Sequence, residues 1–168
     1  LTTKKMAHKS MVTELRWFLK GRTDLRWLLE NNCHIWTGDA YNVYERTHMW
    51  ELDNDYLNVK DFEKKILEDD DFSKQWGNLG FIYGKQWRDW GGDNRNPLEL
   101  KTPGIDQIAA LINDIKENPD SRRLMVNAWN VSDLMYMKLP PCHYGFQIYT
   151  TKLTLEERQE LFCNRLGK

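Results

Sequence analysis

The sequence predicts a mixed α/β fold of the α+β type, in which helices and strands alternate. Segments with helical periodicity follow segments with strand periodicity, and neither an internal repeat nor a low-complexity linker separates them. The 168 residues have the length of one domain. Hydrophobic residues make up 40% of the chain and include eight tryptophans, which is sufficient for a packed core. We therefore expect a single domain over residues 1–168.

The N-terminal segment is expected to be helical. Residues 9–20 carry apolar side chains at helical spacing, and Gly21 is suited to end that helix. Thr23 or Asp24 can cap a second short helix over residues 25–31. The apolar face expected for the first helix consists of Val12, Leu15, Trp17, Phe18 and Leu19.

Residues 42–76 have a different character, because charged and aromatic side chains follow each other without one clear period. Within them, residues 61–71 are typical of a surface helix that turns Phe62 and Ile66 inward. We interpret the whole stretch as an insertion into the domain. After it, residues 81–87 are expected to form a compact aromatic segment.

The second half of the chain alternates more regularly. Residues 105–116 show the clearest helical periodicity, and a proline soon afterwards ends that helix. Strands are expected at residues 124–129 and 144–149, with a short helix capped by Ser132 between them. Residues 155–166 are typical of a helix that lies mostly on the surface.

Charge and composition exclude several classes of function. The 24 Lys and Arg residues nearly balance the 25 Asp and Glu residues, so global charge does not predict binding to DNA. No apolar run approaches the roughly 20 residues that cross a bilayer, and no signal-peptide pattern is visible, so no membrane partner is expected. Three cysteines without a framework spacing are typical of free thiols in a reducing compartment. We expect a cytoplasmic protein.

The chemically most distinctive stretch is Leu139-Pro140-Pro141-Cys142-His143. It places a thiol beside an imidazole at the start of an apolar strand, after two prolines that stiffen the approach. Thiols become strong nucleophiles where a cation or a helix N-terminus favours the thiolate. The alternative is that Cys142 is a small buried hydrophobic residue. If Cys142 is a nucleophile, His143 would orient groups around it rather than act as the base.

Two further features also allow more than one interpretation. Arg122 and Arg123 could bind a phosphate, but adjacent residues of an extended segment point to opposite faces, so a surface charge pair competes with this reading. Glu14 in its apolar helix is either solvent-exposed or buried and able to handle protons. The two Cys-His dipeptides do not predict zinc, because adjacent residues rarely supply two ligands to one tetrahedron. No metal is expected.

Taken together, these segments resemble thymidylate synthase. The runs occur in the family's order, and they cover most of the chain outside residues 42–76 and the C-terminal end. Each run alone is weak, whereas their ordered conjunction is very specific. The matching runs are Leu1-Thr2-Thr3-Lys4-Lys5, Glu14-Leu15-Arg16-Trp17-Phe18-Leu19, Ile35-Trp36, Tyr83-Gly84-Lys85-Gln86-Trp87-Arg88, Asp106-Gln107-Ile108, Asn118-Pro119-Asp120-Ser121-Arg122-Arg123, Ala128-Trp129-Asn130 and Pro140-Pro141-Cys142-His143.

The resemblance implies a thymidylate synthase-like fold, in which helices cover a β-sheet, and the reductive methylation of dUMP to dTMP. In that reaction 5,10-methylenetetrahydrofolate gives both the carbon and the hydride. Cys142 would add to C6 of the uracil, so that C5 becomes nucleophilic and attacks the one-carbon unit of the folate. A base would then remove the C5 proton.

The resemblance also implies roles for individual residues. Glu14 would organise water and protons around the pyrimidine and the folate, Tyr83 would lie near the C5 proton, and His143 would belong to the same hydrogen-bonded network. Lys4 and Trp36 correspond to folate contacts of the family. 

The paired arginines gain a role from the same resemblance. Arg122 and Arg123 correspond to arginines that cross a dimer interface to the phosphate of the neighbouring subunit's dUMP. A homodimer is therefore implied, and the objection that the two side chains point to opposite faces no longer applies.

The sequence departs from the family pattern in several places. Ala7 stands where the family often has histidine. The motifs of the family's downstream half and its upstream Arg-Thr-Gly-Thr phosphate loop are not found, so we expect an incomplete chain that is inactive by itself. Two other functions stay open, namely a hydroxymethylase of dCMP or dUMP and a non-catalytic protein that binds nucleotide or RNA.

Overall fold

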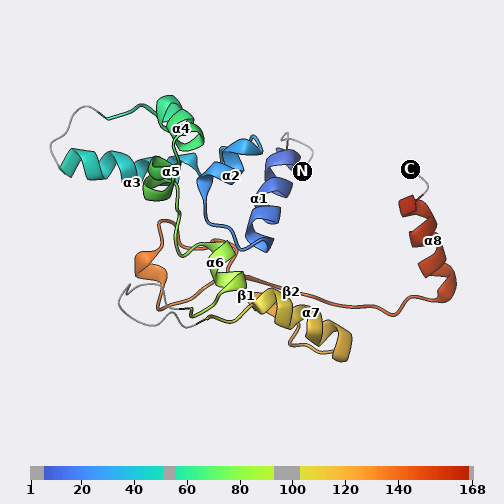
Figure 1. The fold of residues 1–168 in the computed structure, drawn as a ribbon. Coiled ribbons are helices and arrows are strands. Elements are labelled where there is room, and N and C mark those ends of the chain that lie inside the picture. The colour runs from blue at the N-terminus through green and yellow to red at the C-terminus, as the bar shows by residue number, and fades with distance from the viewer. Residues whose placement is uncertain (1–5, 51–55, 93–102, 167–168) are drawn as a thin grey trace.

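The computed structural model describes residues 6–50, 56–92 and 103–166. These residues form eight α-helices, one short 3₁₀ helix and two strands, so the fold is mixed, as predicted (Figure 1). In chain order the elements are α1 (His8–Leu19), α2 (Leu25–Glu30), α3 (Thr37–Trp50), α4 (Val59–Glu68), α5 (Asp70–Trp76), α6 (Tyr83–Arg88), α7 (Gln107–Glu117), β1 (Met125–Asn127), η1 (Leu134–Tyr136), β2 (Gly145–Gln147) and α8 (Leu155–Leu166).

The two predicted strands exist, but each is only three residues long. β1 and β2 pair antiparallel, with Met125 opposite Gln147, Val126 opposite Phe146 and Asn127 opposite Gly145. The side-chain amide of Gln107 replaces a neighbouring strand beside β1, since its Nε2 donates to the Asn127 carbonyl at 2.7 Å and its Oε1 accepts from the Asn127 N–H at 3.0 Å. This helix-borne amide satisfies backbone groups that an unpaired strand edge would leave open.

The short helix α6 connects the N-terminal helices to the sheet. It packs against α1 on one side and against α7 and β1 on the other (Figure 1). Arg88 at its end fixes this arrangement, because its guanidinium donates to the Asp106 carboxylate that caps α7 and to the Leu19 carbonyl at the end of α1. The predicted compact aromatic segment is therefore a helix that positions three other elements.

The apolar face predicted for α1 is only partly correct. Trp17 and Phe18 are 0% and 6% exposed, whereas Val12, Leu15 and Leu19 remain on the surface. The side of α1 that carries Trp17 and Phe18 packs against α6 and α2, and the helix buries that side alone. Periodicity counts apolar residues, but it cannot tell which of them a neighbouring element will cover.

The described residues 37–50 and 56–76 contain three helices, α3, α4 and α5, which share a small aromatic core. Phe62 and Ile66 are fully buried, as predicted, and the Phe62 ring lies 5.1 Å from that of Tyr44 on α3. The single helix predicted at residues 61–71 is wrong in its bounds, because Asp69 ends α4 and its carboxylate accepts the backbone N–H groups of the next turn. That cap starts α5 as a separate helix.

The C-terminal helix α8 has the bounds that the sequence predicts. Every residue from Thr151 to Asn164 is exposed. Figure 1 shows the chain running out from β2 and placing α8 apart from the other helices. Before it, the short helical turn η1 follows Asp133 rather than the predicted cap Ser132.

Among the described residues, no helix combines the length and the apolar character that crossing a membrane requires.

Candidate active site

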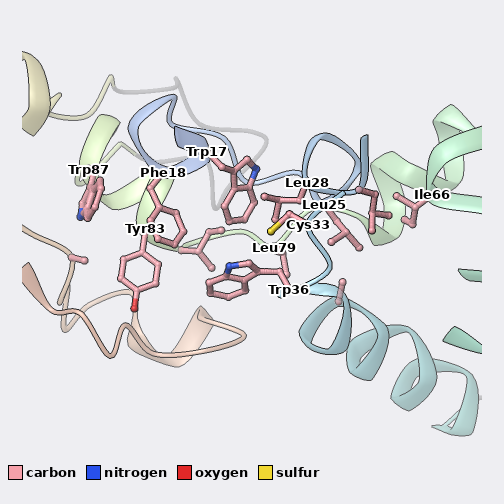
Figure 2. Close-up of a cluster of buried hydrophobic side chains, with 14 of the residues drawn as sticks. Trp17, Phe18, Leu25, Leu28, Cys33, Trp36, Ile66, Leu79, Tyr83 and Trp87 are labelled. Carbon is pink, nitrogen blue, oxygen red and sulfur yellow. The ribbon is translucent and has the colours of Figure 1, made fainter. Parts of the chain in front are cut away.

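A cluster of five aromatic side chains forms the centre of the helical part of the molecule (Figure 2). α1 supplies two of them and α6 supplies two more, and all are at most 6% exposed. The ring centroids of Phe18 and Tyr83 lie 4.4 Å apart, and those of Trp17 and Trp36 lie 5.9 Å apart. The full set is Trp17, Phe18, Trp36, Tyr83 and Trp87.

Glu14 lies at the edge of this cluster, half-buried, one helical turn before Phe18. Its Oε1 accepts a hydrogen bond of 2.8 Å from the indole Nε1 of Trp36. Trp36 is only 3% exposed, so its ring is part of the core and its N–H group holds the carboxylate in place. Glu14 thus lies between the exposed and the buried alternatives, as a partly buried, hydrogen-bonded carboxylate.

Tyr83 joins α6 to the segment that carries the cysteine. Its phenol oxygen accepts a hydrogen bond of 3.1 Å from the backbone N–H of His143, and it lies 3.4 Å from Nδ1 of the same residue. Burial raises the pKa of the Tyr83 phenol, and the charges of Cys142 and Glu14 add to that rise. The phenol is therefore neutral at physiological pH, where it can donate one hydrogen bond and accept others.

Cys142 is exposed, in contrast to the interpretation of a small buried hydrophobic residue. The neighbouring Pro141 is buried and holds the segment against the fold, while the thiol itself stays accessible. Cys142 and Glu14 both affect the pKa of Tyr83, and His143 is hydrogen-bonded to its phenol, so the four groups belong to one region of the molecule. Covalent catalysis requires a thiol with proton-carrying groups nearby, which makes this region the candidate active site.

A buried polar network that the sequence reading missed supports this region. Asn130 Nδ2 donates to Asp133 Oδ2 at 2.9 Å and to Gln86 Oε1 at 3.2 Å, and Gln86 Nε2 donates to Asp133 Oδ2 at 2.8 Å. All three side chains are at most 7% exposed. The network ties α6 to the chain that leads from β1 towards Cys142. The only signal for it in the sequence is that Gln86 and Asn130 lie inside recognised motifs.

Comparison with known proteins agrees with this geometry. A family model described as thymidylate synthase matches residues 1–164. A thymidylate synthase from Mesoplasma florum is 43% identical over 152 residues, which are 90% of this chain and 47% of that protein. Proteins of the same name from Malacoplasma penetrans and from aster yellows witches'-broom phytoplasma are 42% and 44% identical, over 97% and 93% of this chain and 49% of each relative.

The chain belongs to the thymidylate synthase family. It spans about half the length of the curated relatives it matches. The resemblance stated from the motifs is thereby confirmed, and so is the partial thymidylate synthase fold. The roles of individual residues remain predictions.

The remaining residues predicted from the thymidylate synthase resemblance lie elsewhere. Arg122 and Arg123 are both exposed, on the segment that precedes β1. Arg122 lines a groove of about 390 Å³ that β2 and the residues after it complete, and Cys142 is not among the groove's lining residues. Within this one chain the described structure does not bring the arginines to the thiol. Lys4 lies outside the described residues.

The described residues contain no group of three or more His, Cys, Asp and Glu side chains placed to hold a metal ion. The two Cys-His dipeptides are used differently in this thymidylate synthase fold. Cys33 is buried, and burial raises the pKa of its thiol. His34 Nδ1 lies 2.8 Å from the Glu63 carboxylate.

Proposed function

We propose that this chain carries the nucleophilic half of a thymidylate synthase, and that the whole protein converts dUMP to dTMP with 5,10-methylenetetrahydrofolate as co-substrate. The observation that supports this most directly is the convergence of Cys142, His143, Tyr83 and Glu14 from three separate segments. Membership of the thymidylate synthase family also supports this proposal.

In this proposal the sulfur of Cys142 forms a bond to C6 of the uracil, and the electron pair of the C5–C6 bond moves to C5 and O4. A soft, polarisable thiolate suits this step, because it must add to a conjugated carbon and later leave. C5 then bonds to the one-carbon unit of the folate as that carbon releases one of its two folate nitrogens, and C5 loses its proton to a base. The bond from the one-carbon unit to the second folate nitrogen breaks next and leaves a methylene group on C5. A hydride from the released folate adds to this methylene to complete the methyl group, and the sulfur leaves as the C5–C6 double bond re-forms. The products are dTMP and dihydrofolate.

The described residues suit the proton movements of this reaction. The Tyr83 phenol is neutral and hydrogen-bonded to the backbone beside Cys142, so it can pass the C5 proton to water or to a neighbouring group. Glu14 is held by the Trp36 indole, so its free oxygen can order a water molecule near O4. Trp36 would then serve the folate through Glu14 and through the small exposed part of its ring.

Arg122 and Arg123 fit the proposed phosphate contact across a homodimer, because both guanidinium groups are exposed and lie away from the chain's own thiol. Guanidinium groups bind phosphate oxygens in a bidentate geometry, which suits a dianionic nucleotide. The proposed assembly is a homodimer in which each subunit supplies the arginines for its partner's nucleotide. We place the protein in the cytoplasm, where free thiols persist.

Intact-protein mass spectrometry of the full-length polypeptide tests this function. The protein is incubated with 5-fluoro-dUMP and methylenetetrahydrofolate, with Cys142→Ser as the matched control. A ternary adduct that is absent from the control is the expected result. If the full-length protein forms no adduct, the synthase proposal fails. Incubation with dUMP itself separates a methylated product from a hydroxymethylated one by mass.

A further inference from the structure

Lys138 occupies a position that the proposed reaction leaves without a role. It lies four residues before Cys142, and its side chain is half-buried. Its Nζ donates a hydrogen bond of 2.6 Å to the backbone carbonyl of Asn78, in the loop between α5 and α6. A lysine usually keeps its ammonium group in water, so a half-buried lysine bonded to backbone is uncommon and calls for an explanation.

The carbonyl that accepts this hydrogen bond is itself held firmly. The side-chain oxygen of Asn78 accepts from the Gly80 N–H at 2.9 Å and from the Thr23 hydroxyl at 3.0 Å. The backbone around Asn78 also pairs with the segment that leads into α2, where the Leu79 N–H donates to the Thr23 carbonyl at 2.8 Å. Lys138 therefore contacts a fixed point of the helical part and not a freely moving loop.

The charge of Lys138 has a counterpart on a different element. Burial lowers the pKa of Lys138, and the carboxylate of Asp39 in the first turn of α3 opposes that change. Burial likewise raises the pKa of Asp39, and the charge of Lys138 opposes it. Each charge thus offsets part of the effect that burial has on the pKa of the other group.

The segment from Leu139 to His143 consequently has an anchor at each end. At one end Lys138 is bonded to Asn78, and at the other end the His143 N–H is bonded to the phenol of Tyr83. Between them Pro141 is buried while Cys142 is exposed. A thiol on a five-residue segment is placed accurately only if both ends are fixed, and an error of about 1 Å in a reacting atom can cost about 100-fold in rate.

We infer that Lys138 is a positioning residue, which ties the cysteine-bearing segment to the Asn78 carbonyl and so sets the place of the Cys142 sulfur. The expected effect of Lys138 on the reaction rate rests on the proposed function, whereas the hydrogen bond between Lys138 and Asn78 does not depend on the reaction. In this inference Lys138 acts through Cys142 and does not contact the nucleotide.

The test compares Lys138→Met, Lys138→Arg and the exposed control Lys60→Met in the full-length protein. Two quantities are measured, the dissociation constant of dUMP and the rate constant of covalent adduct formation with 5-fluoro-dUMP and methylenetetrahydrofolate. Lys138→Met should slow adduct formation about ten-fold or more while dUMP affinity changes less than about three-fold. Lys138→Arg keeps the charge and the donor, so it should recover most of the rate.

Either of two results overturns the inference. One is that Lys138→Met forms the adduct as fast as Lys60→Met, and the other is that the arginine variant is as slow as the methionine variant. If the unmodified protein forms no adduct, the proposed function is wrong, and hydrogen exchange is then used to test whether Lys138 holds the cysteine-bearing segment in place. In that case the amides of Cys142 and His143 should exchange about ten-fold faster in Lys138→Met, and an unchanged rate would refute this role.

Discussion

Two regions of the molecule differ in how far they bury large aromatic side chains. One is the helical layer, which consists of α1, α2 and α6 with their aromatic cluster. The other is the C-terminal stretch, residues 149–164. In the layer, Trp17 is completely buried, Glu14 accepts a hydrogen bond from Trp36 of the aromatic cluster, and the Tyr83 ring packs against Phe18. In the stretch, Tyr149 is 92% exposed and Phe162 is 64% exposed. The comparison shows that the chain packs the carboxylate and the phenol of the site by itself, whereas the stretch presents an apolar surface of the kind found at interfaces.

The largest expected difference between the two regions concerns their aromatic residues. Trp17→Ala opens a cavity in the layer and should lower the free energy of unfolding by about 3–5 kcal/mol. Phe162→Ala on α8 should change it by less than about 0.5 kcal/mol, because the ring is exposed. Urea denaturation of residues 1–168, followed by tryptophan fluorescence and circular dichroism, measures both. Equal costs would mean that α8 is packed and that the comparison is wrong.

A smaller difference is expected for two glutamines. Gln86→Ala leaves Asn130 and Asp133 buried with fewer partners, so it should cost about 1–3 kcal/mol. Gln147→Ala removes an exposed side chain of β2, whose amide donates to the Arg122 carbonyl, and should cost less than about 0.5 kcal/mol. The same denaturation experiment ranks the two variants. If Gln86→Ala is as stable as Gln147→Ala, the buried network does not stabilise the region of the candidate site.

Acid should lower the stability of the helical layer by protonating Asp106. Burial alone would raise the pKa of Asp106, but the Arg88 guanidinium and the Ala109 N–H lower it, and the net result is a lowered pKa. Its contribution to stability is therefore complete above the usual aspartate pKa of about 3.9 and is lost as the pH falls through the lower folded value. Asp106→Asn should flatten the fall in stability below about pH 4.

The matched control for this acid effect is Asp120→Asn, at an exposed position outside the layer. Urea midpoints between pH 7 and pH 2 are compared for both variants and the unmodified chain. The control should keep the original acid dependence. An unchanged slope in Asp106→Asn would show that the Arg88 pair does not link α6 to α7 in solution.

The smallest effect is expected in the aromatic module of α3, α4 and α5, where surface charge contributes little. Lys74 and Asp71 form an ion pair at 3.2 Å, but their side chains are 77% and 95% exposed. Lys74→Ala should leave the urea midpoint unchanged within error, since solvent screens such pairs. A clear loss of stability, present at low salt and absent at high salt, would contradict this.

Much of the architecture was predictable from local pattern. The bounds of α8 follow from its composition, and the two strands follow from the alternation around Val126 and Phe146. Their shortness was not predictable, because strand ends depend on which backbone groups find partners. The division of residues 61–71 into two helices was also missed, because an aspartate in a charged run can end one helix and cap the next.

The sequence by itself determined the family, because the ordered motifs around Tyr83 and Cys142 are local and can be recognised without any knowledge of contacts. Only the tertiary structure decided that Trp36 holds Glu14, that Tyr83 holds the backbone of His143, and that Lys138 reaches Asn78. These contacts join residues between 22 and 60 positions apart. Hydrogen bonds of that kind depend on how helices pack, and packing depends on which apolar faces find one another in space.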